Sequence, residues 1–113
     1  MSDKVPQPAT EVLLAFTTTP NPESAERIAE ALIGEGLAAC VNQLPAVRST
    51  FRWKGEICRE TESLLIIKTC RSRLDALRKR VLALHPYELP EIVAVEVADG
   101  NPAYLDWILK QCV

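Results

Sequence analysis

The four residues from Leu64 to Ile67 are apolar at every position, and this run constrains the fold more than any other feature of the chain. A strand with one wet face alternates apolar and polar residues, whereas a continuous apolar run is typical of a strand buried on both faces. With 113 residues, of which 48% are apolar, the chain can build one core but not two. The sheet that holds this run therefore needs cover on both sides.

Apolar periodicity predicts the order β-α-β-β-α-β followed by a short helix. The expected strands are residues 12–18, 37–53 with an interruption at Pro45, a third strand ending at Lys68, and 92–98. The expected helices begin at Asn21-Pro22, at Ser72 with Asp75 as a near capping box, and at Asn101-Pro102. Pro45 indicates a bulge or an edge position, because proline cannot donate a ladder hydrogen bond.

This order predicts an α+β fold with a ferredoxin-like antiparallel sheet, because right-handed crossovers place both long helices on one face. One short C-terminal helix offers too little surface to cover the other face. Phe51 and Trp53 also lie far along a hairpin arm. We therefore expect other copies of the chain to supply the missing cover. The domain is expected to span residues 11–113, after a disordered tail at residues 1–10.

Composition argues against several classes of protein. The 13 basic and 15 acidic residues give a net charge of −2, so we expect no nucleic-acid partner. No apolar run approaches the roughly 20 residues of a membrane span, and the N-terminus lacks the layout of a secretory signal. The four cysteines form no Cys-x-x-Cys pair, so neither a zinc knuckle nor a thioredoxin-type site is indicated. We expect a cytoplasmic protein with mostly free thiols.

The sequence HPYELPE at residues 85–91 combines the only histidine with a tyrosine, two glutamates and two prolines. Each proline fixes its own φ and moves the preceding residue away from helical geometry, so the loop is expected to be stiff. A single histidine leaves no Ser-His-Asp or Cys-His pair at readable spacing, and no glycine-rich phosphate loop follows a strand. The sequence therefore predicts a protein that is not an enzyme.

Six motifs in this order resemble the CutA family, named for divalent-cation tolerance. They are TTP at 18–20, LAACVN at 37–42, WKG at 53–55, ESLLIIKT at 62–69, HPYELPE at 85–91 and GNPAYLDW at 100–107. The resemblance covers roughly residues 11–109. It implies a ferredoxin-like fold assembled as a homotrimer, a PII-like outline and a role in tolerance of copper and other divalent cations. It also implies weak metal binding, no tightly bound cofactor and no established reaction.

The resemblance implies a metal site near the HPYELPE loop, with one departure. In the family, copper binding is associated with a cysteine at the end of the first strand, a histidine before the Pro-Tyr pair and the glutamate after the second proline. Here Phe16-Thr17-Thr18 supplies no thiol, so the soft ligand that selects Cu(I) is absent. His85 and Glu91 remain as candidate ligands for Cu(II) or Zn(II). Weaker candidates are Glu88 and Cys40.

The residues themselves leave alternatives open. His85 and Glu91 would stand about 20 Å apart if extended, so a shared ion requires a folded loop or a second subunit. His85 is also consistent with a structural residue that ends a helix and interacts with its negative pole. Tyr87, Lys68 and Trp53 are candidates for a cleft that binds a small effector, as in a PII-like scaffold. Lys68 could pair with Glu91 or an anion, and Trp53 could serve packing alone.

Overall fold

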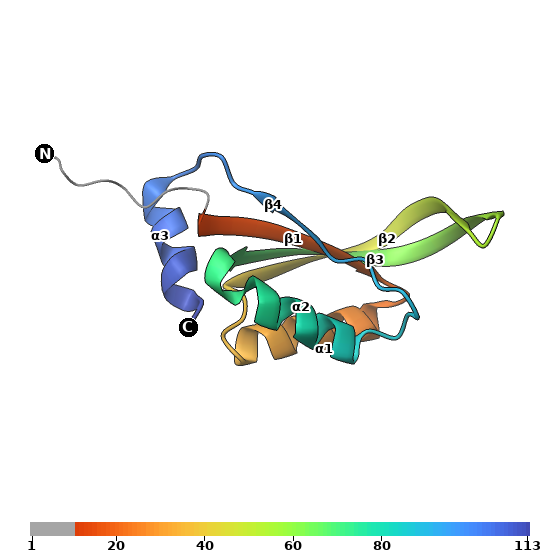
Figure 1. The fold of residues 1–113 in the computed structure, drawn as a ribbon, viewed down its shortest axis with the longest axis horizontal. Coiled ribbons are helices and arrows are strands. Elements are labelled where there is room, and N and C mark those ends of the chain that lie inside the picture. The colour runs from red at the N-terminus through yellow and green to blue at the C-terminus, as the bar shows by residue number, and fades with distance from the viewer. Residues whose placement is uncertain (1–10) are drawn as a thin grey trace, which may run out of the picture.

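The computed structural model describes residues 11–113, which form a four-stranded antiparallel sheet and three helices (Figure 1). The expected N-terminal tail lies outside the described residues. The elements are β1 (Val12–Thr19), α1 (Pro22–Gly34), β2 (Cys40–Trp53), β3 (Glu56–Cys70), a 3-10 turn (Arg71–Arg73), α2 (Leu74–Leu84), β4 (Val93–Glu96) and α3 (Pro102–Gln111). No helix in residues 11–113 is long and apolar enough to cross a membrane.

The strand order β2-β3-β1-β4 confirms the predicted ferredoxin-like α+β fold. The two inner strands pair in register along the whole of β1, from Val12 opposite Cys70 to Thr19 opposite Ser63. The expected helix starts at Asn21 and Asn101 are also confirmed. Each asparagine side chain accepts a backbone N–H of the first turn and is followed by proline, which satisfies a donor that the helix itself leaves unpaired.

Three predicted boundaries are wrong. The chain reaches the sheet only at Cys40, because the preceding residues close helix α1 instead, with the Leu37 N–H bonded to the Leu32 carbonyl. Ser72 does not cap α2, because it lies in the 3-10 turn, where its hydroxyl contacts the Cys70 sulfur at 3.3 Å. Strand β4 is shorter than expected and pairs with β1 over four residues.

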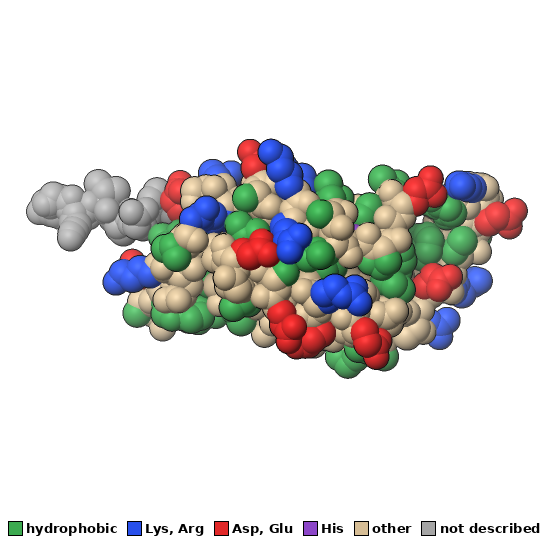
Figure 2. Space-filling model, turned by 90° about the horizontal axis from the view of Figure 1, so that it is seen from below, with side chains coloured by type: hydrophobic (Ala, Val, Ile, Leu, Met, Phe, Trp, Pro, Cys, Tyr) green, Lys and Arg blue, Asp and Glu red, His purple; other side chains and the backbone are tan. Residues whose placement is uncertain are grey.

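The main core lies between the sheet and the pair α1 and α2. Ala15, Leu65 and Ile67 on the sheet pack with apolar residues of both helices, and all three are fully buried. Charged side chains of both signs are scattered over the side of the molecule seen from the helices (Figure 2). This layer buries the odd-numbered residues of β1 and those of β3 from Ser63 to Thr69, so it accounts for one face of the sheet only.

The other side of the sheet, which we call the open face, has little cover within the chain. It carries the even-numbered residues of β1 and β3, and β4 joins it because Val93 and Val95 pair with Phe16 and Leu14. Val93 is 53% exposed and Val95 is 49% exposed. Helix α3 packs only on the end of this face, against Val12 and Cys70. The isolated chain therefore covers only one face of the sheet well, as the apolar run Leu64–Ile67 predicts.

Beyond the bulge at Pro45, strands β2 and β3 continue as a two-stranded arm (residues 47–62) that projects past the helices (Figure 1). The register shift between Leu44 and Val47 confirms the predicted bulge. The radius of gyration is 15.6 Å, against about 13 Å for a compact chain of this length. Phe51, Trp53 and Ile57 are all at least 36% exposed on this arm, so the arm has almost no core of its own.

Candidate functional site

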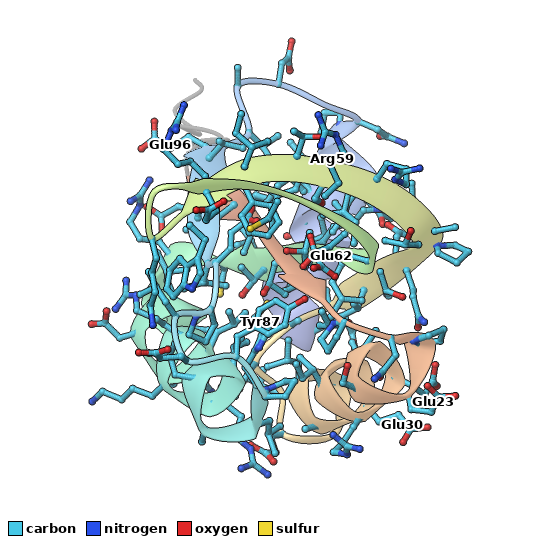
Figure 3. All side chains as sticks on the ribbon, turned by 90° about the vertical axis from the view of Figure 1, so that its right-hand side faces the viewer. Glu23, Glu30, Arg59, Glu62, Tyr87 and Glu96 are labelled. Atoms are coloured by element: carbon cyan, nitrogen blue, oxygen red, sulfur yellow. The ribbon has the colours of Figure 1, made fainter. Side chains whose placement is uncertain are left out.

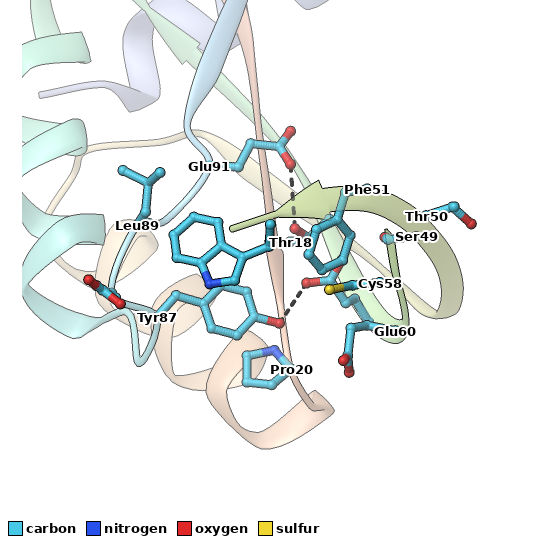
Figure 4. Close-up of a pocket in the computed structure, with 13 residues that line it drawn as sticks. Thr18, Pro20, Ser49, Thr50, Phe51, Cys58, Glu60, Tyr87, Leu89 and Glu91 are labelled. Carbon is cyan, nitrogen blue, oxygen red and sulfur yellow. Dashed lines mark hydrogen bonds between the residues drawn. The ribbon is translucent and has the colours of Figure 1, made fainter. Parts of the chain in front are cut away.

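A cleft of about 830 Å³ opens where the arm passes the end of β1 (Figure 4). Three segments line it: the end of β1 at Thr18, the inner face of the arm, and the loop of residues 85–91. The loop reaches this place because Pro86 prevents α2 from continuing beyond Leu84. The HPYELPE loop therefore lies against the arm, a contact that the sequence did not predict.

His85 fixes the loop to the end of β1. Its side chain is buried, and Nε2 lies 2.7 Å from the Thr18 carbonyl oxygen while Nδ1 lies 3.2 Å from the Tyr87 backbone nitrogen. A carbonyl only accepts and a backbone N–H only donates. The proton therefore sits on Nε2, and Nδ1 accepts from Tyr87. Both ring nitrogens of the neutral imidazole have partners within the chain.

Tyr87 joins the loop to the arm. Its hydroxyl donates to Glu62 Oε2 at 2.6 Å, and its ring centroid lies 4.8 Å from that of His85. Figure 3 shows the Tyr87 side chain between the helices and the arm, next to Glu62. Burial first, and then the hydrogen bond and charge of Glu62, raise the pKa of Tyr87 well above its usual value. The protonated phenol is thus part of the folded cleft.

We expect Tyr87 to stay protonated in the folded protein at about pH 11, one unit above the usual tyrosine pKa. Ionisation of Tyr87 opposes folding, because the unfolded phenol ionises near pH 10.0 and the folded one only at higher pH. Its contribution to stability is therefore complete below pH 10 and is lost as pH rises through the folded pKa. The variant Tyr104→Phe leaves Tyr87 as the sole tyrosine, and phenolate absorbance measures its titration.

The matched variant for this titration is Glu62→Gln on the Tyr104→Phe background. Removing the carboxylate charge should lower the pKa of Tyr87 toward its ordinary value. A phenol that titrates near pH 10 with Glu62 intact would contradict the hydrogen bond as described.

Glu91 is bonded to the same residue as His85, namely Thr18. Its Oε1 accepts from the Thr18 hydroxyl at 3.4 Å (Figure 4), while His85 bonds the Thr18 carbonyl. The loop therefore folds back, as a shared site would require. Even so, no three His, Cys, Asp or Glu side chains within residues 11–113 converge closely enough to hold a metal ion.

The cleft is acidic. Glu60, Glu62, Glu88 and Glu91 line it, and none of its described lining residues is Lys, Arg or His. Carboxylates grouped on the walls of a cleft create a negative potential that raises the local concentration of cations. This arrangement favours cations over anions as occupants.

The remaining predicted site residues divide between the cleft and the rest of the sheet. Trp53 lines the cleft. Lys68 does not, and its Nζ donates to the Tyr104 hydroxyl of α3 at 3.3 Å rather than to Glu91, one of the two partners considered for it. Cys40 pairs with Lys68 across β2 and β3, so it lies with that residue and away from the HPYELPE loop.

Glu60 and Glu62 also line the cleft, although neither was a predicted site residue. Phe51 and Trp53 lie on one face of the arm, because side chains alternate along a strand. With the turn at Lys54-Gly55, the register puts Glu62, Glu60 and Cys58 opposite Val47, Ser49 and Phe51, so counting back from the turn would have found them. What sequence could not provide is that this face of the arm meets Tyr87.

Comparison with known proteins gives consistent results. A family model described as "CutA1 divalent ion tolerance protein" matches residues 13–111. The "Divalent-cation tolerance protein CutA" of Thermus thermophilus is 50% identical over 95 residues, covering 84% of this chain and 92% of that protein. "Protein CutA" of Mus musculus is 45% identical over 97 residues, covering 86% of this chain. The chain spans only 55% of that longer relative.

Two solved structures have folds similar to that of this chain. The structure titled "Periplasmic divalent cation tolerance protein CutA" from Archaeoglobus fulgidus has a TM-score of 0.87 at 38% identity, covering 90% of this chain and 99% of that one. The "PII-like protein CutA" from Nostoc has a TM-score of 0.83 at 41% identity, covering 89% of this chain and 97% of that one.

Proposed function

Since this chain belongs to the CutA1 divalent ion tolerance family, we propose that it is a homotrimer of metal-ion homeostasis that binds divalent cations weakly. Cu(II) and Zn(II) are the ions that imidazole and carboxylate ligands suit. The observation that carries the proposal is the cleft beside β1, which is lined by four glutamates and by no described basic side chain.

The open face supports assembly of several copies. Leu44, Val93 and Val95 are at least 40% exposed there, and an apolar sheet face of this kind marks an interaction surface. Three copies arranged about a threefold axis close their contacts into a ring, which would bury three open faces together. The exposed arm offers each copy a further contact with its neighbour.

In the cleft, Glu91 and Glu88 are the accessible carboxylate ligands in this proposal. His85 is buried and does not itself line the cleft. It would supply a nitrogen through Nδ1, which carries the lone pair and makes the longer of its two hydrogen bonds, to Tyr87. Releasing that bond costs free energy, and two or three ligands leave positions for water. Both features make the affinity modest. Metal ions would therefore exchange readily, with no tightly bound cofactor.

Titration calorimetry with Cu(II) and Zn(II) tests this site. We expect Glu91→Gln to weaken binding about tenfold, the loss of one charge-assisted ligand, and Glu88→Gln to weaken it less. Glu30→Gln is the matched control, because Glu30 is an exposed glutamate on α1 outside the cleft. Unchanged affinity in both Glu91→Gln and His85→Ala would show that the metal binds elsewhere.

A second candidate is a PII-like scaffold whose cleft binds a small effector. The favouring observation is the cleft's size and its aromatic walls at Phe51, Trp53 and Tyr87, since ligand pockets combine apolar walls with few polar groups. A thermal-shift screen of small organic cations and anions separates the two. Stabilisation by an organic compound that Trp53→Ala abolishes, without metal, would favour the scaffold.

We further propose that the protein is not an enzyme and that it acts in the cytoplasm without nucleic-acid or membrane partners. The family is named for ion tolerance rather than for a reaction, and the net charge is −2. The Archaeoglobus fulgidus structure is described as periplasmic, so cell fractionation is the deciding measurement for location.

A further inference from the structure

Two of the four cysteines lie together, far from the cleft. Cys70 is the last residue of β3 and Cys112 follows α3. They are 4% and 8% exposed and belong to one apolar cluster with Val12 and Ile108. The side chain of Cys70 is also among the groups that raise the pKa of the Cys112 thiol. Two elements distant in sequence thus bring a pair of reduced thiols into one buried cluster.

The other two cysteines have no such neighbour. Cys40 lies within β2, and the Cys58 thiol donates to the Glu56 carbonyl oxygen at 3.8 Å on the arm. All four are free thiols in the structure. The pairing of Cys70 with Cys112 in one buried cluster is therefore specific to one place in the fold, where helix α3 meets the sheet.

We propose that Cys70 and Cys112 are an oxidative modification site, at which a peroxide converts the thiol pair into a disulfide that ties α3 to the end of β3. One sulfur attacks a peroxide oxygen, the O–O bond breaks, and one water leaves after proton transfer. The second sulfur displaces hydroxide from the resulting sulfenic acid, which leaves as a second water. Two electrons pass from the two sulfurs to the peroxide.

The surroundings favour this product over an ionised one. A disulfide is neutral, so it suits the apolar cluster, whereas a thiolate is disfavoured there. Burial, followed by the hydrogen bond with Cys70, raises the pKa of Cys112 to about 11, although Thr69 and Arg73 act in the opposite direction. At neutral pH the Cys112 thiol is therefore mostly protonated and reacts slowly, because the thiolate is the nucleophile. Oxidation should accelerate as the pH rises.

The disulfide would also restrict the conformations available to the unfolded chain. A bond between residues 70 and 112 encloses α2, β4 and α3, and cross-links over long loops reduce the entropy of the unfolded state most. The oxidised protein should therefore melt at a higher temperature than the reduced one. This inference is independent of the metal site, since neither cysteine lines the cleft.

The test uses the double variant Cys40→Ser/Cys58→Ser, which keeps only the proposed pair. After treatment with hydrogen peroxide, we expect its free thiols under denaturing conditions to fall from two to none, with a mass loss of two hydrogens. Trypsin cleaves after Lys68, Arg71 and Lys110, so peptides 69–71 and 111–113 should appear joined and separate on reduction. On a non-reducing gel the band should remain that of one chain.

The converse variant, Cys70→Ser/Cys112→Ser, should form no intramolecular disulfide under the same conditions. Several outcomes would overturn the proposal. They are two thiols that persist after treatment, a mass gain from added oxygen in place of the loss of hydrogen, or a cross-link between two chains. Any of these would show that the contact between Cys70 and Cys112 does not support the bond.

Discussion

Val95→Glu is expected to break the assembled protein into single chains. Val95 lies on the open face and is 49% exposed in the isolated chain, so the substitution costs the single chain little. In an assembly it removes about 1.5–3 kcal/mol of side-chain burial per copy and places a charge in an apolar interface, which costs several kcal/mol more. Light scattering should report the mass of one 12.5 kDa chain.

The control for Val95→Glu is Leu82→Glu. Leu82 is also about half exposed, at 45%, but it lies on α2, on the side of the sheet away from the open face. The same gain of charge there should leave the assembled mass unchanged. If Val95→Glu remained assembled, or if Leu82→Glu dissociated equally, the open face would not be the interface.

His85→Ala is expected to destabilise the protein by about 2–4 kcal/mol. The substitution leaves the Thr18 carbonyl and the Tyr87 N–H without their side-chain partners, and each unsatisfied buried group costs about 1–3 kcal/mol. It also removes a buried ring that packs beside the ring of Tyr87. Guanidinium denaturation at fixed protein concentration measures the loss, since the stability of an assembled protein depends on concentration.

Glu88→Ala is the matched control for His85→Ala. Glu88 lies in the same loop, exposed and lining the cleft, so it should change the free energy of unfolding by less than about 0.5 kcal/mol. A loss below that value in His85→Ala would mean that the imidazole does not hold the loop. In that case its Nδ1 would be available for a metal ion at little cost.

Much of the fold could be predicted because its determinants are local. Asn21-Pro22 and Asn101-Pro102 start helices through caps that involve only the next three residues. Pro45 marks a bulge for equally local reasons. The start of α2 at Ser72 was predicted wrongly, because β3 runs on to Cys70 and residues 71–73 form a 3-10 turn before the helix begins.

The site was predictable only in part. The HPYELPE loop stands out in sequence because two prolines and the sole histidine fall together. Its partners do not, because the bond between His85 and Thr18 spans 67 positions and that between Tyr87 and Glu62 spans 25. Likewise, Lys68 ends an apolar run in the sequence, but only the packing of α3 shows that its amino group donates a hydrogen bond to the Tyr104 hydroxyl.

The central claim is that the open face of the sheet is buried between copies of the chain. Sedimentation equilibrium of the unmodified protein at micromolar concentration tests it most directly. The account predicts a single species with three times the 12.5 kDa mass of the chain. A single species of 12.5 kDa would contradict it.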